Sequence, residues 1–107
     1  MSKIKFKIAN AGGGKTKWLV NKAIDGVEHG ITVVFFGGSD EENLKFKQFY
    51  LSMLGMFPSK MIFTDDVNMV PDNSIVLVDN ACKKCIDVHE IKNADVIYAT
   101  LEGELAD

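Results

Sequence analysis

The chain of 107 residues is long enough for one domain, and its content of 47% hydrophobic and 25% charged residues excludes a disordered protein. The formal net charge of −3 argues against a dedicated nucleic-acid-binding protein, which usually carries a basic face. All 12 basic residues are lysines, so the chain has no arginine for planar, bidentate contacts with phosphate.

The N-terminal segment and the cysteine content favour a cytoplasmic protein. Residues 1–7 alternate lysines with apolar residues and hold no signal-peptide core, and no apolar run is long enough to span a membrane. The two cysteines, Cys82 and Cys85, are too few and too close together for a disulfide scaffold. We therefore expect a single domain over residues 1–107 in a reducing location, without a membrane contact.

An alternation of apolar residues predicts a first strand at residues 4–8, with lysines on its other face. A glycine-rich loop follows, and then a helix at residues 15–28 that ends at His29 and Gly30 in the manner of a glycine C-cap. The predicted buried side of this helix carries Trp18, Leu19, Ala23 and Val27.

The rest of the chain continues to alternate between strand and helix patterns. Residues 31–36 are apolar and rich in β-branched side chains, which is typical of a buried strand. Ser39, followed three residues later by Glu42, predicts a capping box that opens a second helix ending near Leu54. Further strands are predicted at residues 61–64, 75–78 and 96–99, and a third helix at residues 81–90. The pattern predicts an α/β three-layer sandwich with about five mostly parallel strands.

The segment between the first strand and the first helix has the composition of a phosphate-binding loop. Residues 9–16 read ANAGGGKT, in the strand-to-helix context that a Walker A motif requires. Glycines let several backbone N–H groups converge on an anion, and the helix N-terminus adds positive dipole character. The residues expected to bind nucleotide phosphates are Ala11, Gly12, Gly13, Gly14, Lys15 and Thr16. Because Ala9 replaces the first glycine of the motif, an ordinary glycine-rich turn is the alternative.

The sequence ANAGGGKTKWLVNKA resembles motif I of the superfamily-one (UvrD-like) helicases, P-loop NTPases in which alanine often replaces the first glycine. The segment TVVFFGGSDEENLKFKQFYLSM is similar in hydrophobic pattern to their next strand and motif Ia region, and IVLVD resembles their Walker B strand. The resemblance implies a RecA-like core that binds ATP, or another NTP, with Mg²⁺. It also implies a central first strand covered on both faces. Lysines in that strand do not fit this position, unless one face is thinly covered or a partner covers it.

Asp79 and Thr16 are the predicted magnesium ligands. Asp79 ends an apolar strand at the edge of a parallel sheet where ligands bind, and it would hold the ion opposite the Thr16 hydroxyl. The alternative is an aspartate that only caps the next helix.

Fast hydrolysis by the isolated chain is not expected. In the helicases a glutamate that activates water follows this aspartate, whereas this chain has Asn80, which cannot accept a proton. The chain also has no arginine finger. Glu102 and Asp40 are possible substitutes that the sequence does not rank, so the catalytic residues stay unassigned.

Cys82, Cys85 and His89 would lie on one face of the third predicted helix, where they could hold a metal. Structural zinc sites usually add a second ligand pair from another element, and none exists here, so two reduced thiols are the favoured interpretation.

Two functions from different classes follow. The first is a small ATP-binding, or other NTP-Mg²⁺-binding, P-loop protein with slow or partner-dependent hydrolysis. The second is a regulatory module that uses the P-loop fold as a scaffold for docking on a larger protein. Nucleoside kinase chemistry is a weaker third, because lid and acceptor-site segments are not found. A translocating motor needs two RecA-like domains, so we do not expect this chain to translocate alone. The expected partners are a nucleotide and either another protein or a second copy of the chain.

Overall fold

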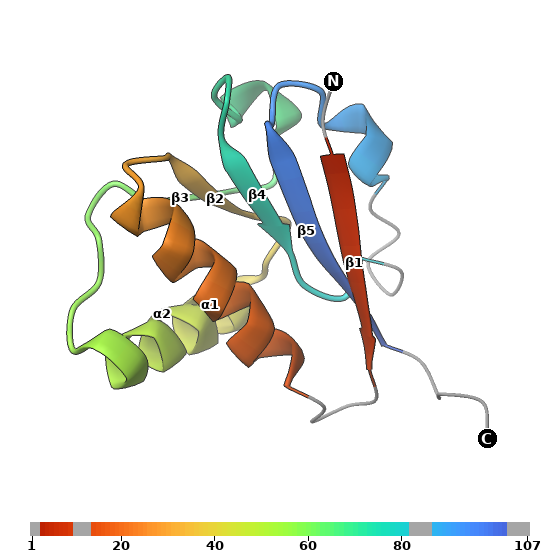
Figure 1. The fold of residues 1–107 in the computed structure, drawn as a ribbon. Coiled ribbons are helices and arrows are strands. Elements are labelled where there is room, and N and C mark those ends of the chain that lie inside the picture. Colours follow the sequence, from red (N-terminus) through yellow and green to blue (C-terminus); the bar gives the residue numbers. More distant parts are fainter. Residues whose placement is uncertain (1–2, 10–13, 82–86, 103–107) are drawn as a thin grey trace.

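The computed structural model describes residues 3–9, 14–81 and 87–102, which hold five strands, two α-helices and two short 3-10 helices (Figure 1). The strands are β1 (Lys3–Ala9), β2 (Val33–Phe36), β3 (Ile62–Thr64), β4 (Ile75–Val78) and β5 (Val96–Glu102). The helices are α1 (Lys15–Glu28) and α2 (Asp40–Leu54), and the 3-10 helices are η1 (Val67–Met69) and η2 (Val88–Glu90). No helix in this part of the chain is long and apolar enough to cross a membrane.

The strands form one sheet in the order β1-β5-β4-β2-β3, and every neighbouring pair is parallel. The central strand β4 is buried along its whole length, as its unbroken apolar sequence predicts. The predicted α/β class and the five parallel strands are thereby confirmed. Because all strands point the same way, the segments that follow β1, β2 and β4 leave the sheet at one common edge.

The two faces of the sheet are covered differently. Both α-helices lie on one face (Figure 1), where Leu19 and Ala23 of α1 and Phe46 and Tyr50 of α2 belong to one buried cluster. The cluster on the other face is closed by residues of connecting segments and of η2, namely Val70, Ala81, Val88, Ile91 and Ala94. Within the described ranges, no α-helix covers this second face.

The third predicted helix, at residues 81–90, is not seen where the structure describes the chain. Residues 82–86 lie outside the described residues, and the segment beyond them forms only the 3-10 helix η2. The Asp87 carboxylate accepts a hydrogen bond of 2.9 Å from the backbone N–H of His89, which begins this short turn. Asp and Asn side chains compete with helices in this way, because they offer the backbone a local partner.

The expectation of a central first strand is wrong, because β1 lies at the edge of the sheet. Its strand partner is β5, in a register that runs from Lys3 beside Val96 to Ala9 beside Glu102. Lysines are common on edge strands, where they discourage pairing with other chains, which explains their presence in β1. On the opposite face Phe6 and Ile8 are 49% and 54% exposed, so this face is thinly covered at β1.

Aromatic contacts fix α2 on the sheet. The rings of Phe35 in β2 and Phe46 in α2 stack with their centroids 4.5 Å apart, and Phe63 of β3 meets Phe35 edge-on at 5.8 Å. A Cβ atom on Gly38 would collide with the Phe35 ring and with Asn43 Oδ1, so glycine allows the chain to turn tightly from β2 into α2. The first turn of α2 is therefore held close to the carboxyl edge of the sheet.

Candidate functional site

A hollow at the carboxyl edge of the sheet brings together residues predicted from distant segments. It has two parts, of about 210 and 400 Å³, and Thr16, Glu42 and Asp79 line both of them. The smaller part is also lined by Leu19, Phe35, Lys45 and Phe46, and the larger part by Gly14, Lys15, Lys17, Phe49 and Asn80. The two predicted magnesium ligands, Thr16 and Asp79, therefore share one cavity.

The N-terminal end of α1 lies at this cavity. Gly14 precedes the helix with φ of 82°, in the left-handed region that favours glycine, and its carbonyl accepts the first helical bond from Trp18 N–H at 3.0 Å. Among the described residues no side-chain cap is seen at this end, in contrast to α2. Such an end can bind an anion. Ala11, Gly12 and Gly13 lie outside the described residues.

Asp79 is oriented by Thr100, a residue of β5 that the sequence analysis did not single out. The Thr100 hydroxyl donates a hydrogen bond of 2.8 Å to Asp79 Oδ1 and accepts one of 2.8 Å from the Asn80 backbone N–H. Thr100 itself is fully buried. The sequence offers little to predict this role, because a single hydroxyl residue after an apolar strand segment is common in ordinary strands.

Asn80 adopts a left-handed conformation with φ of 54°, which asparagine tolerates better than most residues do. Its side-chain Nδ2 donates a hydrogen bond of 3.2 Å to Glu102 Oε2. Its Oδ1 is buried and has no hydrogen-bond partner in the described part of the chain. The side chain at position 80 is thus placed by the turn after β4, and it lines the larger part of the hollow.

The two carboxylates that the sequence suggested as substitute bases are not among the residues that line the hollow. Glu102 contacts the Asn80 amide at the end of β5, and Asp40 is exposed in the first turn of α2. The structure therefore favours neither residue as the general base.

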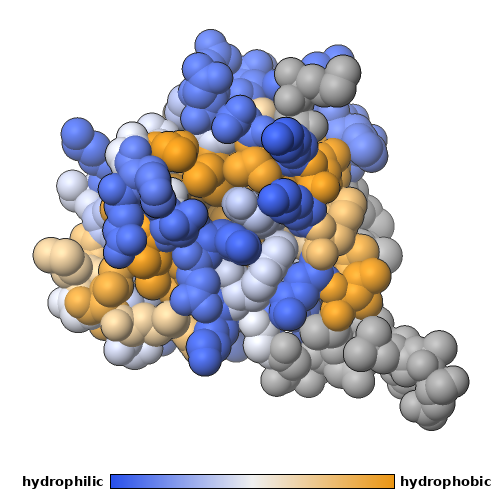
Figure 2. All heavy atoms as spheres, in the orientation of Figure 1, coloured by the Kyte–Doolittle hydropathy of each residue, from blue (hydrophilic) through white to orange (hydrophobic). Residues whose placement is uncertain are grey.

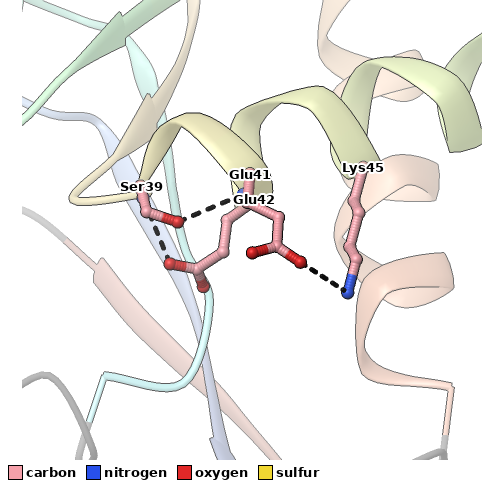
Figure 3. Close-up of polar contacts among 4 residues, drawn as sticks. All are labelled: Ser39, Glu41, Glu42 and Lys45. Atoms are coloured by element: carbon pink, nitrogen blue, oxygen red, sulfur yellow. Dashed lines mark hydrogen bonds and ion pairs between the residues drawn. The ribbon is translucent and has the colours of Figure 1, made fainter.

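Glu42 is a further site residue that the sequence does not reveal, because its spacing from Ser39 predicts only a role in helix capping. The capping box is present as predicted: Ser39 Oγ accepts from Glu42 N–H at 3.2 Å, and Ser39 N–H donates to Glu42 Oε1 at 3.1 Å (Figure 3). The same side chain also lines both parts of the hollow. The sequence did contain a signal for this location, because a helix that follows a parallel strand begins at the edge of the sheet where ligands bind.

The cysteine pair cannot be placed, because Cys82 and Cys85 lie outside the described residues. His89, the third member of that predicted group, is exposed in η2. The described residues hold no cluster of three histidine, cysteine or carboxylate side chains that could bind a metal.

Comparison with known proteins adds no relative to this description. No family model, characterised protein or solved structure matches the chain.

Proposed function

We propose that the protein binds a nucleoside triphosphate with Mg²⁺, ATP being the first choice, in the hollow at the carboxyl edge of the sheet. The observation that carries the proposal is that Thr16 and Asp79, which come from α1 and from the end of β4, line the same cavity. In this arrangement Gly14 and Lys15 contact the phosphates, together with the loop residues before them. Thr16 and Asp79 supply oxygen ligands, which Mg²⁺ prefers.

Two further features support this assignment. The start of α1 combines a left-handed glycine with a helix end that lacks a side-chain cap in the described residues, which suits a phosphate group. The Thr100 hydroxyl fixes one oxygen of Asp79, and side chains that orient a metal ligand are a regular part of metal sites. The resemblance to superfamily-one motif I agrees with both features.

In this proposal, the protein hydrolyses its bound nucleotide slowly or with the help of a partner protein. Asn80 has a side-chain amide, which donates a hydrogen bond to Glu102 and cannot act as a general base. The chain also has no arginine to stabilise charge in the transition state. An arginine finger contributes about 10³–10⁵-fold to turnover in enzymes that use one, and a partner protein can supply it.

A second candidate function is a docking module in which the fold serves as a scaffold. The observation that favours it is exposed apolar surface on two elements. Phe6 and Ile8 are exposed on β1, and Leu44, Leu51 and Leu54 are 43–55% exposed on α2. Figure 2 shows apolar surface in the region of both elements. Large exposed apolar patches often mark protein contacts.

Calorimetric titration with ATP, GTP and ADP, with and without Mg²⁺, tests the proposal. We expect Mg²⁺-dependent binding of triphosphates that is strongly weakened in Asp79→Asn. Asp72→Asn is the matched control, because Asp72 is exposed before β4, at the opposite end of that strand. Absence of binding by the wild-type protein would leave the docking module as the remaining candidate.

A further inference from the structure

We infer that Glu42 is the carboxylate that accepts the proton of the attacking water, in the role that Asn80 cannot fill. The inference rests on the proposed nucleotide site and names a catalytic residue within it. Glu42 and Asp79 are the carboxylates that line the hollow in the described part of the chain, and both border its two parts. Asp79 is directed to the metal in the proposed site, which leaves Glu42 for the water.

The position of Glu42 is set by its hydrogen bonds with Ser39 and by the packing of the helix that carries it. The Ser39 backbone N–H holds Oε1 at 3.1 Å, and this bond turns the side chain back toward the start of the helix (Figure 3). The stacked rings of Phe35 and Phe46 hold the same helix on β2, and Gly38 allows the close approach between them. A general base must be positioned in this way, because proton transfer requires hydrogen-bond distance to the reacting water.

Neighbouring carboxylates do not share this placement. Glu41 lies one residue earlier and forms an exposed ion pair with Lys45, with Nζ and Oε1 3.7 Å apart. In Figure 3 its carboxylate extends toward Lys45, whereas that of Glu42 turns toward Ser39. Glu41 therefore offers a control with the same charge in the same helical turn but without a place in the hollow.

The chemical step needs no reagent beyond water and the nucleotide. The water oxygen forms a bond to the γ-phosphorus, while the bond from that phosphorus to the β–γ bridging oxygen breaks. Glu42 takes one proton from the water and later returns it to solvent. The electron pair of the broken bond stays on the bridging oxygen of the diphosphate product, where the Lys15 ammonium neutralises developing charge. General-base assistance of this kind contributes about 10²–10⁴-fold.

The test compares Glu42→Gln with Glu41→Gln in single-turnover hydrolysis of γ-labelled ATP, followed over hours, with nucleotide affinity measured in parallel. Glutamine can replace glutamate in a capping box, so Glu42→Gln should fold with an unchanged melting temperature. We expect hydrolysis to fall by about 10²-fold or more in Glu42→Gln, with affinity nearly unchanged. Glu41→Gln should behave as the wild type.

The outcomes separate the two proposals. Failure of the wild type to bind any nucleotide would refute the proposed function, and the inference with it. Nucleotide binding combined with equal rates for the wild type and Glu42→Gln would refute the inference alone. A wild type that binds but does not hydrolyse ATP would refute it in the same way, as would a Glu42→Gln variant whose main defect is in affinity.

Discussion

The hydroxyl of Thr100 donates a hydrogen bond of 2.8 Å to Asp79 Oδ1 and so links the interior of β5 to the carboxylate that follows β4. The same oxygen accepts the Asn80 N–H, so one buried side chain holds both the carboxylate and the turn that follows it. Asp79 is thereby oriented before any ligand arrives. Pre-oriented groups bind more tightly, because less conformational entropy is lost on binding.

Replacing Thr100 by Val removes these two bonds while keeping the shape of the side chain. We expect the free energy of unfolding to fall by about 1–3 kcal/mol, because the Asn80 N–H loses its partner in a partly buried turn. Mg²⁺-dependent nucleotide affinity should fall more than Mg²⁺-independent affinity. Urea denaturation and calorimetry measure the two effects. Thr100→Ser keeps the hydroxyl and should restore the Mg²⁺ dependence, and an equal loss in both variants would show that packing alone is responsible.

Replacing Lys15 by Ala should weaken triphosphate binding by about 1.5–3 kcal/mol, the range for a hydrogen bond to a charged group. Stability should change little, since Lys15 is the first residue of α1 and is only partly buried. The control is Lys60→Ala, because Lys60 is exposed before β3, at the amino ends of the strands. Equal nucleotide affinity in wild type and Lys15→Ala would contradict the phosphate-binding role of this loop.

Replacing Asn80 by Glu, the residue that the helicase resemblance implies, should destabilise the fold. A left-handed conformation costs most residues roughly 1–2 kcal/mol, and the new carboxylate would lie near that of Glu102. Asn80→Gly removes the backbone strain and should retain more stability. The melting temperatures of the two variants test this prediction. If Asn80→Glu were as stable as Asn80→Gly, the turn after β4 would have to accommodate the glutamate without strain.

His29 predicts a small dependence of stability on pH. Its Nδ1 lies 2.7 Å from the Asp25 carbonyl oxygen, and this hydrogen bond, followed by the charge of Asp25, raises the pKa of the imidazole. Because the pKa in the folded state is the higher one, the stabilisation is complete below the unfolded value near 6.5 and is lost as pH rises through the folded value. Urea denaturation of wild type and His29→Gln should therefore differ most at low pH. A difference that grows with pH would contradict this assignment.

Purified protein should contain no stoichiometric zinc, because Cys82 and Cys85 have no second ligand pair in the sequence. A chelator should leave the melting temperature unchanged. Metal analysis that finds about one zinc for each one or two chains would overturn this expectation.

Apart from the third predicted helix, the helices and strands could be predicted closely, because their signals are local. The predicted helix at residues 15–28 and the predicted strand at residues 75–78 agree with the structure, and the Ser39 capping box starts α2 as expected. Capping residues, glycine C-caps and unbroken apolar runs act within a few residues of one another, so one segment contains the whole signal.

The features that could not be predicted from the sequence depend on contacts between residues that lie far apart in the chain. The edge position of β1 follows from its pairing with β5, and nothing within residues 3–9 specifies that partner. Thr100 meets Asp79 only after β5 has packed beside β4. Glu42 was recognised for its bond to Ser39, three residues away, whereas its place in the hollow depends on how α2 packs against the sheet.

The pairing of β1 with β5 has a consequence for the order in which the protein can assemble during synthesis. Among the described residues, the strand that leads into the glycine-rich segment leaves the ribosome first, and its strand partner, Val96–Glu102, leaves last. Chains emerge from the N-terminus at about 5–20 residues per second, so β1 waits for several seconds without a neighbour in the sheet. During that interval Phe6 and Ile8 are available to chaperones, and the hollow acquires its Asp79–Thr100 bond only when β5 arrives.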